Sequence, residues 1–162
     1  LDLDIPAVFI GNLPNHAVDS VKLDDFGGGH LIGTHLARRG HTRIAHVTGP
    51  AIFAEAMARA DGFEAGLRDS GVAPDEALRF EGTYLPPSGR EAARWLIGLK
   101  GKARPTAVFF PNYLMAMGAL TEFHHQGVRV PDDIAAAVFD DLPQLEYVRP
   151  RLTRAGKLIL NK

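Results

Sequence analysis

The sequence contains no cysteine, so the chain forms no disulfide bond and offers no thiolate to a metal ion. It also has no long apolar run, because its hydrophobic stretches are far shorter than the roughly 20 residues that a membrane-spanning helix needs. An excess of one charge sign is lacking too, since 18 basic and 19 acidic residues give a net charge of -1. A chain that grips the DNA backbone needs clustered Lys and Arg. These absences exclude disulfide-rich and membrane-spanning proteins and argue against DNA binding by this chain itself.

The first residues, LDLD, are acidic and lack the basic flank and the apolar segment of a secretory signal peptide. An initiating Met is also absent. The lack of cysteine fits a reducing compartment. We therefore expect an excised piece of a cytoplasmic protein that has no contact with a membrane.

What the sequence does contain is an alternation of short apolar runs and longer stretches with helical spacing. At 162 residues, with 46% hydrophobic and 23% charged residues, the chain has the length of one domain, or of one lobe and part of another. The apolar runs predict strands, and spacings of three and four residues predict helices. The expected strands are residues 5–10, 43–50, 77–80, 106–110 and 134–139, and the expected helices are 27–39, 55–70, 88–101 and 113–126.

Helices of this length between consecutive strands predict right-handed crossovers and a mostly parallel sheet. The strands are apolar along their whole length, as expected when helices cover both faces of a sheet. The predicted fold class is therefore α/β, with a doubly wound, mostly parallel sheet flanked by helices. Asp25 is a possible cap of the first helix, and Ser88 with Glu91 fits a capping box that opens the third.

Polar residues follow four of the predicted strands. Because the carboxyl ends of parallel strands meet at one edge of a sheet, these side chains are expected to gather there and to form a ligand pocket. The pairs that follow the second, third, fourth and fifth strands are Thr48 with Gly49, Thr83 with Tyr84, Asn112 with Tyr113, and Asp140 with Asp141.

Two of the candidate site residues also have an ordinary structural interpretation. Asn112 stands directly before a helix, where Asn is a favoured cap. Arg59 lies early in the second helix, beside the strand ends, where its guanidinium can bind two hydroxyls or a carboxylate. An Arg on a helix surface can equally be solvated. For each of the two residues the sequence leaves both the structural and the ligand-binding interpretation open.

The other motifs do not indicate a phosphate-binding, metal-binding or catalytic site. The glycines of DDFGGGHLIGTHL, residues 24–36, match neither a P-loop nor G-x-G-x-x-G, so we interpret them as permitting close helix packing. The seven histidines show no metal-binding spacing, and no metal site or cofactor is predicted. Asp140 and Asp141 leave a strand in diverging directions and have no nucleophile signature beside them. We therefore predict no catalytic residue, assign Asp140 to ligand hydroxyls and leave Asp141 as a possible cap of the next turn.

Five segments together carry a family resemblance. They are GHTRIAHVTGP, ARADGFEAGLRDSG, PTAVFFPNYLMAMGAL, GVRVPDDIAAAVFDD and YVRPRLT, in this order along residues 5–153. The chain resembles the effector-binding core of the lac repressor / gal repressor family of bacterial transcription regulators. The resemblance implies a periplasmic-binding-protein-like fold of two α/β lobes that close on a small molecule, usually a sugar or nucleobase. It also implies a homodimer whose separate N-terminal helix-turn-helix reads operator DNA.

The resemblance also implies roles for individual residues. Arg59 matches the Arg of R-x-x-G-F, which contacts the effector, and Asn112 matches the Asn after the fourth strand. Asp140 matches the first acid of F-D-D, and Tyr84 stands where some members stack an aromatic ring on the sugar. The expected effector-binding residues are thus among those that follow the predicted strands or lie beside their ends.

The chain departs from the family pattern at several places. Tyr113 stands where the family usually has Asp, and Val138 replaces a Gly. The tail RAGKLILNK does not follow the usual continuation. We expect residues 1–23 to be a remnant of the first lobe, 24–149 to be the second lobe, and 150–162 to be a crossover or tail.

The sequence leaves three functions open. The first is the effector-binding and dimerising region of a transcription regulator, with a sugar as the expected ligand. The second is a solute-binding protein for sugar uptake, which shares the fold. The third is a small α/β enzyme, for which the sequence shows no nucleophile or base constellation.

Overall fold

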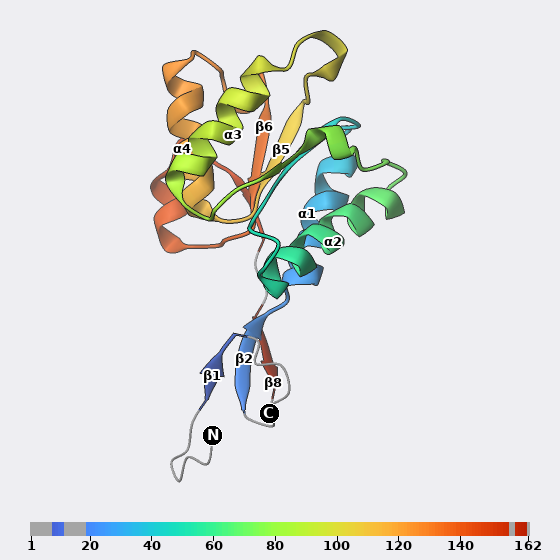
Figure 1. Ribbon diagram of the computed structural model, residues 1–162, viewed down its shortest axis with the longest axis vertical. Coiled ribbons are helices and arrows are strands. Elements are labelled where there is room, and N and C mark those ends of the chain that lie inside the picture. The colour runs from blue at the N-terminus through green and yellow to red at the C-terminus, as the bar shows by residue number, and fades with distance from the viewer. Residues whose placement is uncertain (1–7, 12–18, 156–157, 162) are drawn as a thin grey trace.

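The protein consists of a large body and a small sheet that extends from one end of it (Figure 1). The computed structural model describes residues 8–11, 19–155 and 158–161. In the body, a five-stranded sheet is flanked on one face by helices α1 and α2 and on the other by α3 and α4 (Figure 1). The four helices are α1 (Asp25–Arg38), α2 (Ala54–Asp69), α3 (Pro86–Gly98) and α4 (Tyr113–His125).

The large sheet has the strand order β4-β3-β5-β6-β7, and every pair of neighbours is parallel. The chain starts at β3, moves outward to β4 and then returns past β3 to β5, so the direction of winding reverses between β3 and β5. The predicted α/β fold class is confirmed. The strands are β3 (Ile44–Thr48), β4 (Arg79–Glu81), β5 (Ala107–Phe110), β6 (Ala135–Val138) and β7 (Thr153–Arg154).

The small sheet agrees only partly with the sequence prediction. It contains β1 (Phe9–Ile10), β2 (Ser20–Leu23) and β8 (Leu158–Asn161), with β2 parallel to β1 and antiparallel to β8. Residues 5–7 of the first predicted strand lie outside the described residues. The prediction missed β2 and β8, which pair with each other from opposite ends of the sequence. β7 pairs with β6 in the large sheet and begins at Thr153, four residues beyond 149, the expected end of the second lobe. The division into lobes stays a prediction.

The core of the body fills both faces of the large sheet. Val47, Val108 and Phe110 pack toward α3 and α4, whereas Phe109 and its neighbours pack toward α1 and α2. The residues of α2 that the helical spacing predicts to face inward are all at most 3% exposed: Ala56, Ala60, Phe63 and Leu67. Helices on both faces of the sheet explain why the strands are apolar along their whole length.

Glycines bring α1 and α2 into backbone contact. A Cβ added to Gly29 or Gly33 of α1 would collide with carbonyl oxygens of α2, at Arg59 and Phe63. A Cβ at Gly62 of α2 would collide with the carbonyl oxygen of Phe26 in α1. The prediction that these glycines permit close packing is therefore confirmed. The same approach brings the first turn of α1 beside Arg59.

The predicted helix starts need two corrections. α1 is capped by Asp24, whose Oδ1 accepts a hydrogen bond from Gly27 N at 2.9 Å, so Asp25 is not the cap. The capping box of Ser88 and Glu91 is also wrong, because α3 already begins at Pro86. Proline is favoured there since its missing N–H has no partner in a first turn. The Ser88 hydroxyl instead accepts a hydrogen bond from Thr83 N at 3.0 Å and donates one to Leu85 O at 3.0 Å.

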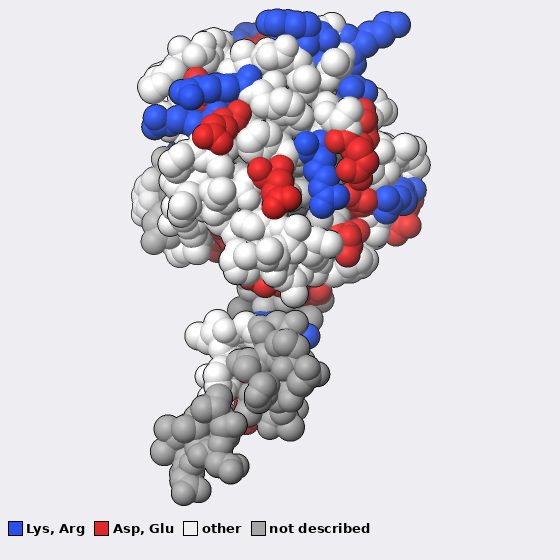
Figure 2. All heavy atoms as spheres, in the orientation of Figure 1, with Lys and Arg blue, Asp and Glu red and all other residues white. Residues whose placement is uncertain are grey.

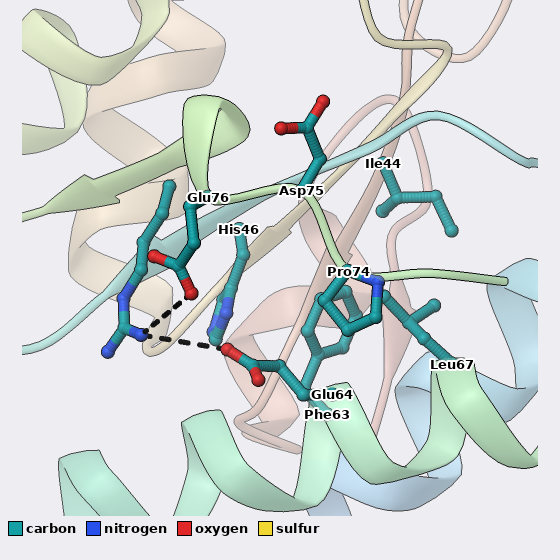
Figure 3. A pocket seen from close by; sticks show the side chains of 9 residues that line it. Ile44, His46, Phe63, Glu64, Leu67, Pro74, Asp75 and Glu76 are labelled. Carbon is teal, nitrogen blue, oxygen red and sulfur yellow. Dashed lines mark ion pairs between the residues drawn. The ribbon is translucent and has the colours of Figure 1, made fainter.

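His46 lies in the core of the body beneath α2. Its ring packs against Phe63 and Phe109, at centroid distances of 4.5 and 5.3 Å. Beside it is a small cavity of about 10 Å³, drawn in Figure 3, where the Arg79 guanidinium pairs with Glu64. Burial lowers the pKa of His46 to about 3, and repulsion from Arg79 adds to this. The imidazole is therefore neutral in the folded protein.

We predict that Gly62→Ala lowers the free energy of unfolding by about 2 kcal/mol, because the added methyl group must push α1 away from α2. Gly98→Ala is the matched control, since a Cβ at this helical position meets nothing within 4 Å. The control is expected to be neutral or to stabilise the protein by up to about 1 kcal/mol. Urea unfolding measures the free energy of unfolding of both variants. Equal effects of the two variants would contradict the tight packing of α1 on α2.

The neutral state of His46 predicts a pH dependence of stability. Because the folded pKa of about 3 lies below the ordinary value of 6.5, the unfolded chain binds a proton that the folded chain rejects. This stability is complete above pH 6.5 and is lost as the pH falls toward 3, by about 1.4 kcal/mol per pH unit. Urea unfolding between pH 7 and pH 4 should show a steeper loss for the wild type than for His46→Leu. Parallel curves for the two proteins would show that His46 titrates normally.

Candidate functional site

The four predicted site residues lie at the carboxyl ends of the strands of the large sheet. This edge includes the point between β3 and β5 where the winding reverses, which is where ligands bind in open α/β sheets. Asn112 Nδ2 donates a hydrogen bond to the carbonyl oxygen of Tyr84 at 2.9 Å, and Asp140 Oδ2 accepts one from Tyr113 N at 2.7 Å. The structure therefore brings Arg59, Tyr84, Asn112 and Asp140 to one edge.

Arg59 is buried and held by three separate elements. Its Nε donates to Asp25 Oδ1 of α1 at 2.7 Å, and its Nη1 donates to the carbonyl oxygen of Pro111, after β5, at 2.6 Å. Its Cζ lies 3.9 Å from the ring centroid of Phe139, which follows β6. The alternative of a solvated surface Arg is therefore wrong. Within the described residues Nη2 makes no hydrogen bond, so this nitrogen is the donor that remains for a ligand.

The partner of Arg59, Asp25, is also mostly buried, with side-chain exposures of 10% for Arg59 and 15% for Asp25. Burial raises the pKa of Asp25, and the hydrogen bond and charge of Arg59 act in the opposite direction. An ion pair in such surroundings is only weakly screened by solvent and salt. Removing either charge would leave the other one buried without its partner.

Asn112 is a helix cap and a link between loops at the same time. Its Oδ1 accepts a hydrogen bond from Met115 N at 3.0 Å, which satisfies a free donor at the start of α4. Through Nδ2 the same amide holds the backbone of Tyr84. The structural interpretation of Asn112 is thus correct, and this residue positions the aromatic side chain that the sequence places in the site.

Asp140 and Asp141 point to different partners. Asp140 uses Oδ2 at the start of α4, and its Oδ1 makes no hydrogen bond within the described part of the chain. Asp141 pairs with Arg154 of β7 at 3.0 Å, and no cap bond by its side chain is found among the described residues. The two acids therefore do not form a carboxylate dyad, and Asp140 keeps one oxygen for a ligand hydroxyl.

Tyr84 adopts an unusual backbone conformation, with φ of +65°. Its ring lies against Gly49, where a Cβ would collide with it. Among the described residues, two buried side-chain oxygens have no hydrogen-bond partner in the protein, namely Tyr84 OH and Thr48 Oγ1. Burial raises the pKa of the Tyr84 phenol, while the charge of Arg59 opposes this shift. Unsatisfied buried polar atoms and a strained backbone are features that cluster at binding sites.

A cleft of about 860 Å³ lies between the small sheet and the starts of α1 and α2. Its volume falls in the range of about 300 to 1,000 Å³ that is typical of small-molecule sites. Of the four predicted residues, Arg59 alone lines this cleft. The ring centroid of Tyr84 lies 6.1 Å from that of Phe53, which is one of the lining residues. The lining residues are Ile10, Gly11, Val21, Lys22, Leu23, Asp24, Asp25, Phe26, Phe53, Ala54, Glu55, Ala58 and Arg59.

Sequence reasoning missed the other polar groups of the cleft. Asp25 and Glu55 stand in the first turns of α1 and α2, and Lys22 lies in β2. Because both helices begin at the strand-end edge, the acids in their first turns are the sequence signal from which these groups could have been found. Within the described residues no group of three or more His, Asp or Glu side chains is arranged to hold a metal ion. No described helix combines the length and apolarity needed to span a membrane.

Comparisons with known proteins agree with this geometry. Residues 34–155 match the family of periplasmic binding protein-like domains. The chain is 36% identical over 151 residues to the HTH-type transcriptional repressor PurR of Edwardsiella ictaluri, covering 92% of this chain and 44% of that protein. The chain thus spans less than half the length of this relative.

Solved structures show the same fold. A LacI family transcriptional regulator from Mycobacterium smegmatis is 32% identical with a TM-score of 0.82, covering 93% of this chain and 55% of that one. A regulatory protein of the LacI family from Chloroflexus aggregans is 27% identical with a TM-score of 0.83, covering 92% and 53%. The chain therefore belongs to the family of periplasmic binding protein-like domains, and within it to the lac repressor / gal repressor type of effector-binding core.

Proposed function

We propose that the chain is the effector-binding and dimerising region of a bacterial transcription regulator that acts in the cytoplasm. The observation that carries this proposal is the position of Arg59, which belongs both to the strand-end cluster and to the wall of the cleft. A small molecule in the cleft contacts this guanidinium directly. The relatives named above are regulators, which favours this function over a solute-binding protein for uptake or an enzyme.

The expected effector is a sugar or a related polyhydroxyl compound, as the four site residues suggest. Arg59 offers Nη2 as a donor, and Asp140 offers Oδ1 as an acceptor. The Tyr84 ring supplies an aromatic surface that suits the C–H groups of a sugar ring. Asn112 acts mainly by holding Tyr84 and the start of α4 in place. Of the four residues Arg59 lines the cleft and is the proposed direct contact, and the other three are proposed to complete the site from the strand ends.

DNA binding is assigned to a helix-turn-helix elsewhere in the regulator. On the face shown in Figure 2, basic side chains gather at the upper end of the large body and are mixed with acidic ones over its middle. The mixed middle of this face offers no continuous basic track for a phosphate backbone. The half-buried apolar residues of α4, including Leu114, Met117 and Leu120, are proposed to form part of a two-fold contact in a homodimer.

Calorimetric titration of the complete regulator with D-ribose, D-galactose, adenosine and inosine tests the effector site. At least one of these compounds should bind, and Arg59→Ala should weaken that binding at least tenfold, because a charged donor to the ligand is lost. Arg68→Ala is the matched control on the same helix, since Arg68 is 59% exposed and pairs with Glu64 within α2. The control should keep the affinity of the wild type within twofold. Absence of heat from every compound, or equal affinities of all three proteins, would contradict the proposed site.

A further inference from the structure

We infer that Asp25 makes the cleft selective for uncharged polar effectors and against anionic ones, because it neutralises Arg59 inside the wall of the cleft. This inference rests on the proposed function, in which the effector binds beside Arg59. An Arg in a binding cleft ordinarily attracts carboxylates and phosphates. Here the guanidinium already has a carboxylate partner in the same chain, Asp25, at 2.7 Å.

The surroundings of this pair make the neutralisation effective. Asp25 and Arg59 are only 15% and 10% exposed, so solvent screens their charges weakly. The carbonyl oxygen of Pro111 and the ring face of Phe139 complete the surroundings of the guanidinium. An anionic ligand would therefore have to displace Asp25 from Arg59. Otherwise the anionic group of the ligand and the Asp25 carboxylate would compete for the one guanidinium. A hydroxyl or carbonyl group of a neutral ligand can accept from Nη2 without disturbing the pair.

The formal charge of the described residues that line the cleft points in the same direction. Asp24, Asp25 and Glu55 supply three carboxylates to its lining, and Lys22 and Arg59 supply two cations. Over these described residues the sum is one negative charge. An anionic ligand would enter a cleft that is already negative, and desolvation in the cleft would strengthen the repulsion.

Helix N-termini are the remaining source of attraction for an anion, since their free N–H groups and dipoles favour negative charge. α1, α2 and α4 begin at this edge of the sheet, and acids of the chain stand at each start. Asp24 caps α1, with Asp25 in its first turn, and Glu55 stands in the first turn of α2. Asp140 accepts the first N–H of α4, from Tyr113. At α1 and α4 the chain's own carboxylates therefore accept hydrogen bonds that a ligand phosphate would otherwise take, and at α2 Glu55 adds a negative charge to the first turn.

The test compares two matched pairs of ligands, inosine with inosine 5′-monophosphate and D-ribose with D-ribose 5-phosphate. Calorimetry on the complete regulator gives, for each pair, the ratio of the dissociation constant of the phosphorylated compound to that of the neutral one. The wild type should bind the neutral compound at least tenfold more tightly. Asp25→Asn keeps an acceptor for Arg59 Nε but removes the charge, and it should lower this ratio about tenfold. The steric cost of the phosphate cancels when the ratio of a variant is compared with that of the wild type, because both ratios use the same two ligands.

Two further variants complete the experiment. Asp61→Asn removes an exposed acid of α2 that does not line the cleft, and it should leave the ratio unchanged. Glu55→Gln removes an exposed cleft carboxylate without touching the ion pair, and it should lower the ratio by a smaller factor, about threefold. If Asp25→Asn fails to fold, this variant still tests whether negative charge in the cleft disfavours the phosphorylated ligand, and the wild-type ratio tests the predicted preference itself.

The outcomes separate the inference from the function on which it rests. If a wild-type ligand is found but the phosphorylated compound binds as tightly as the neutral one, the inference is overturned and the effector site stands. The same holds if the ratio is equal in wild type, Asp25→Asn and Glu55→Gln. If none of these four compounds binds to the wild type, and D-galactose and adenosine do not bind either, the proposed function fails, and the inference fails with it.

Discussion

The buried contact between Arg59 and Asp25 is the interaction on which the rest of the site depends. Arg59 comes from α2 and Asp25 from the first turn of α1, directly after the strand β2 of the small sheet. The same guanidinium reaches the end of β5 through Pro111 O and lies on Phe139 at the end of β6. One side chain thus joins the large sheet, both helices of one layer and the segment that leads to the small sheet.

This contact requires the close approach of two helices, and glycine makes that approach possible. Gly29 of α1 lies against the carbonyl oxygen of Arg59, where any larger residue would hold the helices apart. Asp24 caps α1 and so leaves the neighbouring Asp25 to face Arg59. The glycine-rich stretch is therefore important for the site although it matches no phosphate-binding motif. Packing between helices sets the distance at which the two charges meet.

Much of the fold follows from local patterns, and the site follows only in part. Apolar runs such as that of β5 and helical spacings such as that of α2 predict the elements because local sequence dominates there. The rule that polar residues gather at the carboxyl ends of parallel strands brings Asn112 and Asp140 together correctly. The prediction of Asp25 as a cap is wrong, since two consecutive acids before a helix offer equal candidates and only the packed neighbour Arg59 separates them. The small sheet depends on pairing between β2 and β8, which lie at opposite ends of the sequence, and no local signal reports such a contact.

A fixed Arg59 guanidinium in the folded protein is the central claim. The exchange rate of its Nε–H proton with solvent, measured by nitrogen-15 NMR and assigned with Arg59→Lys, reports this directly. We predict much slower exchange than for the Nε–H of Arg68, which is 59% exposed and holds its partner through Nη2. We further predict that Asp25→Asn accelerates the exchange at Arg59. Equal exchange rates at Arg59 and Arg68 in the wild type would contradict the claim.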